Sequence, residues 1–302
     1  MTGNLDTVLI IADLEGSSGC LNYRAASFMT RDWSVACLEM TRDVNAVVRA
    51  IFHAGVKRVI VKDFHRTAYN ILPELIDPRA QILSGYKCGP VPGIGHAGGA
   101  EAVMFLGMHA ASGTEGFLAH TLTSRIIWLE VNRKPLAEVE LFAASLAPYG
   151  VRPIFFSGCS VACAQAEAAI GKIGTYPIDK SVGAESLDTD AWRLGLANSA
   201  VEALGNTATE PYAPTGPFRA EVTMQGGEKT VRKLARRWGF ASDGYRIFLE
   251  ADEMRQLYGK LIRLCYLTPF TEKILPFPLL FNNLKGRIGL EWVRRRQSIS
   301  IS

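Results

Sequence analysis

The sequence predicts an α/β protein in which a mainly parallel sheet is flanked by helices, together with a smaller α+β portion. Two observations lead to this fold class. Apolar runs of strand length, rich in β-branched residues and without polar alternation, recur along the chain and suit strands that are covered on both faces. The first three predicted elements also form a β-α-β unit, which implies parallel pairing and a right-handed crossover.

The β-α-β unit comprises a strand at residues 8–11, a helix and a second strand at 58–63. Val35 to Ile51 carry apolar residues at helical spacing, and Gly55 follows as the stop signal. Further strands are expected at 80–83, 102–107, 126–131 and 152–157, and further helices at 136–146, 161–170 and 191–204.

The expected domain organisation has three parts. Residues 1–206 form the α/β portion, and the proline-containing stretch 207–217 marks a boundary. Residues 207–269 form the smaller portion packed on it, with strands at 218–224 and 245–249 and helices at 231–236 and 252–264. Residues 270–302 are a C-terminal extension, expected to be either a solvated charged end or a contact between subunits.

Composition excludes several classes of protein. The 302 residues are 48% hydrophobic, enough for a substantial core, and the net charge of +4 is too small to predict nucleic-acid binding. Absence of an apolar run of about 18–20 residues and of a signal peptide predicts a cytoplasmic protein without a membrane partner. Six cysteines without a CxxC pair form neither a disulfide framework nor a zinc-finger pattern.

Polar side chains follow three of the predicted strands directly. Asp13 and Glu15 come after the first strand, His65 after the second and His109 after the strand at 102–107. Parallel strands end at the same sheet edge, and ligands bind at that edge in open α/β sheets. Asp13 and Glu15 alone are explained equally well as caps of the next helix or as part of a binding site. Two of the chain's five histidines follow strands in the same way, and this favours a binding site.

The residue types at this edge predict a metal centre. Asp13, Glu15, His65, His109 and one more acid make a mixed nitrogen and oxygen set suited to Zn²⁺, Mn²⁺ or Fe²⁺. Such a set exceeds the three protein ligands of a single catalytic zinc, whereas a pair of metals about 3.5–4 Å apart fits better. Paired metals generate hydroxide at neutral pH and polarise a carbonyl, which is the chemistry of amide hydrolysis.

Two further residues have both a structural and a functional interpretation. His120 lies in a loop of small residues; it either makes one structural hydrogen bond or transfers protons, binds an oxyanion or acts as a nucleophile. Glu138 lies in the first turn of the helix at 136–146, where the helix dipole alone explains an acid.

Six short motifs resemble the DppA-type D-aminopeptidases, a family of dinuclear zinc, self-compartmentalising metallopeptidases. Their order and spacing match over about residues 7–265. The motifs are Asp13-Leu14-Glu15-Gly16-Ser17-Ser18-Gly19, Lys62-Asp63-Phe64-His65, Leu83-Ser84-Gly85, Phe105-Leu106-Gly107-Met108-His109, Gly116-Phe117-Leu118-Ala119-His120-Thr121 and Pro135-Leu136-Ala137-Glu138.

The resemblance implies an activity and assigns roles to residues. It implies a metal-dependent aminopeptidase that releases N-terminal D-amino acids from short peptides or aminoacyl amides. It also implies two Zn²⁺ per subunit, with Asp13 as the bridge, and a ring of identical subunits, a decamer, around the active sites. His120 occupies the position of the family's catalytic residue, and the implied zinc ligands are Asp13, Glu15, His65, His109 and Glu138.

Two alternative functions remain from the sequence. The segment 181–186 departs from the family pattern, which favours a related amidohydrolase acting on a specialised non-peptide amide. The other alternative is a non-catalytic scaffold or binding protein that forms rings. Metal content separates the scaffold from both enzymes, and a panel of D- and L-substrates separates the two enzymes.

Overall fold

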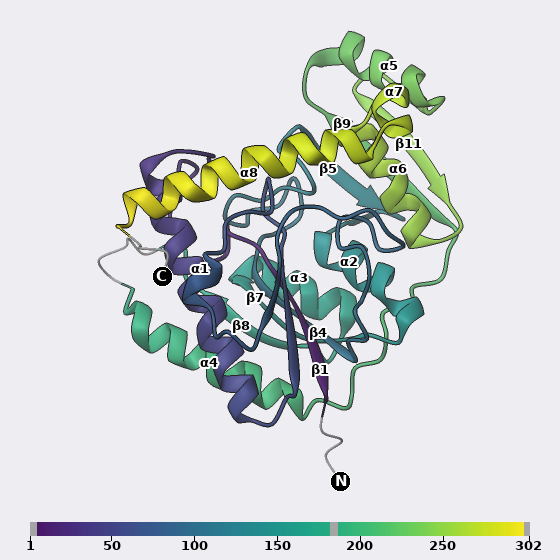
Figure 1. Cartoon of the computed structure of the whole chain (residues 1–302). Helices are drawn as coiled ribbons and strands as arrows, with labels where there is room; N and C mark the ends of the chain where they lie inside the picture. The colour runs from purple at the N-terminus through teal and green to yellow at the C-terminus, as the bar shows by residue number, and fades with distance from the viewer. Residues whose placement is uncertain (1–4, 182–186, 299–302) are drawn as a thin grey trace.

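The structure is a computed structural model that describes residues 5–181 and 187–298. Two sheets and the helices around them make up the chain, and one long helix, α8 (Pro276–Arg296), crosses the molecule on the outside (Figure 1). The larger sheet is parallel and the smaller is antiparallel. The predicted fold class is therefore confirmed.

The larger sheet has the strand order β3-β2-β1-β4-β7-β8, and every pair in it is parallel. This is the order of a doubly wound fold, in which the chain reverses direction across the sheet between β1 and β4, and ligands bind outside the carboxyl ends of those strands. Its strands are β1 (Thr7–Ala12), β2 (Arg58–Asp63), β3 (Gln81–Leu83), β4 (Ala102–Met108), β7 (Arg152–Cys159) and β8 (Gly174–Ile178).

Both faces of this sheet are buried, as its uninterrupted apolar runs predict. Along β1, Leu9 and Ile11 belong to one hydrophobic core, and Val8 and Ile10 belong to the other. Helices α1 (Arg31–His53) and α4 (Thr189–Leu204) cover the second face. The first face is covered by α2 (Glu138–Leu146), α3 (Ser160–Ile170) and the smaller sheet.

Helix α1 follows the predicted pattern closely. Thr30 caps its first turn, since the Thr30 hydroxyl accepts a hydrogen bond from the Trp33 backbone N–H. Its last turn ends at His53, and Gly55 has a φ of 102°, a left-handed conformation that glycine adopts without strain. Its buried face runs from Trp33 to Phe52, so the amphipathic prediction for this helix is confirmed.

The smaller sheet combines strands from both sides of the predicted boundary at 207–217. Its order is β10-β11-β9-β5-β6, and β5 pairs with β9 in antiparallel fashion. The predicted domain boundary at residue 206 therefore separates strands that belong to one sheet. Whether the two portions fold as separate units stays a prediction. The elements are β5 (Ile126–Val131), β6 (Lys134–Pro135), β9 (Phe218–Met224), β10 (Ala241–Asp243), β11 (Arg246–Ala251), α5 (Gly227–Trp238) and α6 (Met254–Tyr266).

Several elements are not anticipated by the sequence patterns. Strand β8 contains Gly174 and Pro177, both of which weaken a strand signal. Helix α8 has prolines at its start, where the backbone N–H groups are unpaired in any case. The remaining short helices are η1 (Pro73–Leu75), η2 (Ala147–Tyr149) and α7 (Pro269–Lys273).

Within the described ranges, none of the helices has both the length and the apolar character that crossing a bilayer requires.

Gly16 provides a test of how tightly the loop after β1 is packed. A Cβ atom there would overlap the backbone carbonyl groups of Gly107 and Met108, whereas one at Gly259, inside α6, would meet nothing within 4 Å. We expect Gly16→Ala to lower the free energy of unfolding by about 2 kcal/mol and Gly259→Ala to raise it by about 0.5 kcal/mol. Urea denaturation of both variants measures the two effects, and equal stability would contradict the close packing at Gly16.

Candidate metal centre

Three neighbouring strands bring the predicted residues to one edge. Ala12 at the end of β1 is in register with Asp63 of β2 and with Leu106 of β4. The hydrogen-bond ladder continues past the strand ends, since Asp13 N–H donates to the Leu106 carbonyl at 2.8 Å. Asp13 follows β1 directly, so this bond fixes its backbone beside β4, at the switch point of the sheet.

The structure gathers the predicted ligands into two adjoining groups. Asp13, Glu15 and His65 offer donor atoms that lie within 4.8 Å of one another. His109, His120 and Glu138 form a second such group. Geometry alone is therefore compatible with two roles for His120: a metal ligand, or a residue that lies next to the ligands.

Asp13 connects the two groups. Its Oδ1 lies 3.3 Å from His65 Nδ1, and its Oδ2 lies 3.3 Å from His109 Nε2. Glu15 Oε2 lies 2.9 Å from the same His65 nitrogen, and Glu138 Oε1 lies 3.5 Å from the same His109 nitrogen. Each imidazole thus faces one oxygen of Asp13 and one glutamate.

Backbone carbonyl groups orient the three imidazole rings. His65 Nε2 lies 3.2 Å from the Ala26 carbonyl, His109 Nδ1 lies 3.1 Å from the Ala110 carbonyl, and His120 Nδ1 lies 2.8 Å from the Leu118 carbonyl. A ring nitrogen that donates to a carbonyl carries the proton, which leaves the other nitrogen free as a ligand or base. In each neutral ring the free nitrogen is the one that faces the carboxylates, and in a protonated ring that nitrogen donates to them.

Electrostatics couples the buried carboxylates to the imidazoles. Burial opposes the charge of Asp13, but hydrogen bonds from His109 and His65 outweigh it and hold the pKa of Asp13 well below its usual value. Burial also opposes charge on His65, but Glu15 and Asp13 raise its pKa to about 10. Because three carboxylates are buried together, the edge needs positive charge, from imidazolium groups or from cations.

Glu138 reaches this edge from the first position of α2. It is buried, and its Oε1 accepts a hydrogen bond of 2.6 Å from the Leu122 backbone N–H. Burial raises its pKa, but the neighbouring charge of His109 lowers it more. The helix-dipole interpretation and the site interpretation are thus compatible, and the 3.5 Å contact with His109 brings Glu138 into the same group as the other candidate ligands.

His120 lies at the mouth of the group. Its ring stacks on His109 with centroids 3.8 Å apart and an angle of 13° between planes, and its Nε2 lies 4.0 Å from Glu15 Oε1. The side chain is 21% exposed, against 2–8% for the other five, so it is the one most open to an incoming molecule. Burial and the charge of His109 lower its pKa, which favours the neutral ring.

A buried polar network holds the His65 loop, and the sequence did not reveal it. The Asp63 carboxylate accepts hydrogen bonds from the Asn70 side chain (2.9 Å) and from the Asn70 and Ile71 backbone N–H groups. Asn70 also donates to the His65 carbonyl at 2.7 Å and accepts from Trp33 Nε1 at 3.0 Å. Asp63 belongs to a motif of the sequence analysis, whereas Asn70 gave no signal.

Lys180 is a second residue that the sequence did not single out. Its ammonium group donates to the Cys20 carbonyl at 2.8 Å and to the Ser17 carbonyl, and it thereby closes the loop that carries Glu15. Burial lowers its pKa to about 8. The segment 182–186, most of the stretch that departs from the family pattern, lies outside the described residues.

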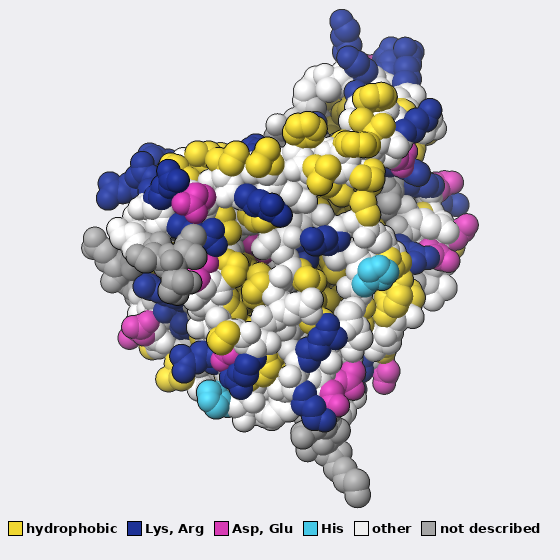
Figure 2. Space-filling view, viewed as in Figure 1, with side chains coloured by type: hydrophobic (Ala, Val, Ile, Leu, Met, Phe, Trp, Pro, Cys, Tyr) yellow, Lys and Arg dark blue, Asp and Glu magenta, His cyan; other side chains and the backbone are white. Residues whose placement is uncertain are grey.

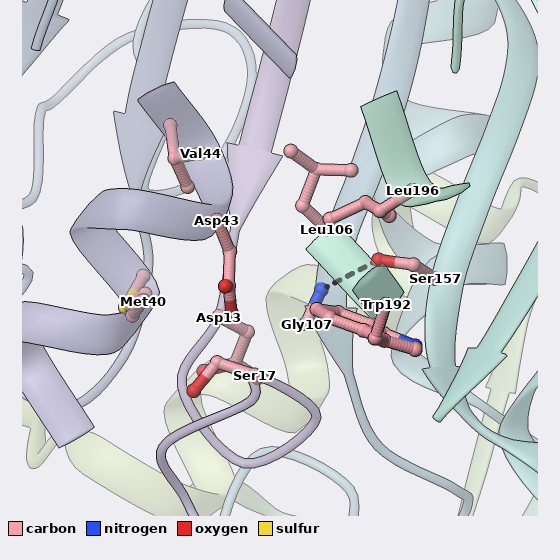
Figure 3. Close-up of a pocket in the computed structure, with 10 residues that line it drawn as sticks. All are labelled: Asp13, Ser17, Met40, Asp43, Val44, Leu106, Gly107, Ser157, Trp192 and Leu196. Carbon is pink, nitrogen blue, oxygen red and sulfur yellow. Dashed lines mark hydrogen bonds between the residues drawn. The ribbon is translucent and has the colours of Figure 1, made fainter. Parts of the chain in front are cut away.

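A small cavity lies on the inner side of this loop (Figure 3). Asp13, Ser17 and Gly107 border it together with side chains of α1 and α4, and Gly107 N–H donates to Ser157 Oγ at 3.1 Å. His65, His109 and Glu138 do not line it. We therefore regard it as a packing space behind Asp13 and place the site on the other side of that residue.

Comparison with known proteins identifies the family to which the chain belongs. The model of the peptidase M55 family, described as D-aminopeptidase, matches residues 7–262. The chain belongs to the D-aminopeptidase family. It is therefore a member of a family of peptide hydrolases, and the resemblance found in the sequence motifs is confirmed.

Individual D-aminopeptidases agree with the family match. A curated D-aminopeptidase of Bacillus subtilis strain 168 is 25% identical over 219 residues, which cover 70% of this chain and 78% of that protein. The solved structure of a zinc-dependent D-aminopeptidase from Bacillus subtilis, DppA, described as a self-compartmentalising protease, has a TM-score of 0.77. At 21% identity it covers 85% of this chain and 96% of that one, and this similarity confirms the fold.

The network around Asn70 yields a prediction about stability. Asn70→Ala removes the partner of Trp33 Nε1 and two donated hydrogen bonds inside the protein, so we expect the free energy of unfolding to fall by about 3 kcal/mol. Asn45→Ala, which removes one partly buried bond to the Asp77 backbone N–H, is the control and should cost about 1 kcal/mol. Urea denaturation of the metal-free variants compares them, and an equal loss in both would contradict the proposed importance of the network.

Proposed function

We propose that the protein is a metal-dependent aminopeptidase that releases N-terminal D-amino acids from short peptides or amides. The proposed metals are two zinc ions per subunit, held by Asp13, Glu15, His65, His109 and Glu138. The observation that carries the proposal is the position of Asp13, whose two oxygens each face a different imidazole at 3.3 Å. The preference for D-amino acids rests on the family and on the Bacillus subtilis relatives.

The residues at the site fit zinc. Glu15 Oε2 is buried and accepts no hydrogen bond of acceptable geometry from the described residues, although His65 Nδ1 lies 2.9 Å away. A buried carboxylate oxygen and an imidazole nitrogen this close together suit two ligands of one ion. Imidazole nitrogens oriented by backbone carbonyl groups are the preferred nitrogen ligands of zinc.

Asp13 would hold both ions, as the proposed bridge between them. His65 and Glu15 would hold one ion with it, and His109 and Glu138 would hold the other. When bound, such a pair lowers the pKa of water and polarises the scissile carbonyl. The protein's own contribution is to hold the five side chains in a buried, preorganised set.

His120 is the proposed catalytic residue. With its Nδ1 donating to the Leu118 carbonyl and its pKa lowered, the neutral ring presents Nε2 as a lone pair toward the site. That nitrogen can accept a proton from the attacking group and return it to the leaving amine. The same lone pair suits the alternative in which His120 attacks the carbonyl itself.

We further propose that identical subunits assemble into a ring that encloses the sites and admits short substrates, with a decamer as the expected size. This proposal rests on the Bacillus subtilis relative, which is described as self-compartmentalising. An amidohydrolase that acts on a non-peptide amide would use the same side chains, and substrate selection separates it from a peptidase.

The role of His120 is tested by comparing three histidine variants. We expect His120→Ala to lower kcat by about 10²–10⁴-fold, as for loss of an acid–base group, while bound zinc is retained. His65→Ala should lose both activity and metal. His53→Ala is the control, because its ring is exposed and hydrogen-bonds to the Arg49 carbonyl of its own helix, away from the site. Loss of zinc from His120→Ala would instead make His120 a ligand.

Substrate class is tested with a panel of D- and L-aminoacyl amides, dipeptides and non-peptide amides. We expect the highest kcat/KM for substrates with a free N-terminal D-residue, and loss of hydrolysis when that amine is acetylated. Fast hydrolysis of N-acetylated or non-peptide amides would favour the amidohydrolase. No hydrolysis by zinc-loaded protein across the panel would favour the scaffold.

A further inference from the structure

Helix α8 (Pro276–Arg296) lies beyond the part of the chain that the family model matches, residues 7–262. One side of it is firmly attached to the protein. Trp292 stacks on Trp33 with centroids 6.0 Å apart, and Arg294 makes two hydrogen bonds to Glu74, at 2.8 and 3.0 Å. Gly289 allows close approach, since a Cβ there would overlap the ring of Phe28. The orientation of α8 is therefore fixed.

The opposite side of α8 is apolar and exposed. We call it the apolar stripe; its side chains are 55–73% exposed and comprise Phe277, Leu280, Phe281, Leu284 and Ile288. Figure 2 shows hydrophobic side chains in a row along this helix. Tyr266 and Phe270, just before α8, are exposed as well, so residues 266–288 hold half of the exposed large hydrophobic side chains in the described part of the chain.

The size of this surface indicates a partner. Together the seven side chains expose on the order of 800 Å² of apolar area, about 600 Å² of it in the apolar stripe, from the usual areas of aromatic and aliphatic side chains. A typical monomer leaves its largest apolar patch at about 300–600 Å². About 800 Å² is what one partner contributes to an interface of standard size.

The spacing of the stripe indicates that the partner is a helix. Phe277, Phe281, Leu284 and Ile288 follow one another at steps of four, three and four residues, the spacing of the seam of a coiled coil. The same steps continue to Glu291 and Arg295, so charged residues end the seam. A lipid surface would call for a broad apolar face rather than a narrow seam.

We propose that the apolar stripe packs against the apolar stripe of a second copy of this chain, with the two α8 helices antiparallel about a twofold axis near Asn282 and Asn283. This contact is self-complementary, because Phe277 faces Ile288 and Phe281 faces Leu284 of the second copy. It lies on a helix outside the family match, and none of the proposed metal ligands takes part in it.

Charge favours the antiparallel arrangement. Arg294, Arg295 and Arg296 end the helix, and a parallel pair would bring the two arginine clusters together. In the antiparallel pair the clusters lie at opposite ends.

Helix α8 also contacts the loop that carries His65, so the proposed contact between subunits lies next to the candidate metal centre. Asn282 Nδ2 donates to the Thr67 carbonyl at 3.3 Å, two residues beyond His65. A Cβ at Gly286 would overlap the ring of Tyr69 in the same loop. The helix that carries the stripe thus also supports the loop that places His65.

The test is the mass of the full-length protein in solution, measured by light scattering after size exclusion. Phe281→Lys and Leu284→Glu each place charges in the contact, so we expect each variant to have half the mass of the wild type. Leu194→Glu is the matched control, an exposed leucine (63%) on α4, and should leave the mass unchanged. Circular dichroism checks that all variants are folded.

Mixing the two variants tests the register. In the antiparallel pair the lysine introduced by Phe281→Lys in one chain would face the glutamate introduced by Leu284→Glu in the other, so we expect the mixture to regain the wild-type mass. The proposal would be overturned if both single variants kept the wild-type mass, or if the wild type were a monomer. Failure of the mixture to regain the wild-type mass would overturn the antiparallel register.

Binding to phosphatidylglycerol vesicles tests the alternative of a lipid surface. Binding by the wild type that is lost in Leu284→Glu, without any change of mass, would identify a lipid surface instead. Zinc content, measured alongside, reports separately on the metal site.

Discussion

The carboxylate of Asp13 lies between two imidazoles, and the rest of the site depends on that position. Each of its oxygens faces one histidine at 3.3 Å, and each histidine faces one glutamate in addition. Three carboxylates buried this closely are stable only with compensating positive charge. The edge therefore suits the binding of cations, and we propose that the Asp13 carboxylate is shared by two of them.

The fold supplies this position through the order of its strands. Because β1 lies between β2 and β4, residues that follow the three strands meet at one point although up to 96 positions separate them in sequence. Gly16 and Gly107 let the backbones of the two loops touch, with Gly16 N–H donating to the Gly107 carbonyl at 2.7 Å. Close packing behind Asp13 thus aims its carboxylate outward, toward His65 and His109.

Much of this arrangement could be predicted from the sequence, because strand signals and chemistry coincide in it. Uninterrupted apolar runs located β1, β2 and β4, and the polar residue after each run indicated the edge. Asn70 and Lys180 were missed because Asn70 accepts from Trp33 and Lys180 donates to the Ser17 and Cys20 carbonyl groups. These partners are distant in sequence, and no local pattern encodes them. Helix α8 was missed because its prolines and glycines weaken a helix signal, while packing on Trp33 and Glu74 stabilises it.

The most direct measurement is anomalous X-ray scattering at the zinc edge from crystals of the protein purified with zinc. The account predicts two peaks per subunit about 3.5–4 Å apart, one on each side of Asp13. One peak should lie against His65 Nδ1 and Glu15, and the other against His109 Nε2 and Glu138. A single peak, or two peaks that do not share Asp13, would contradict the bridging role on which the account depends.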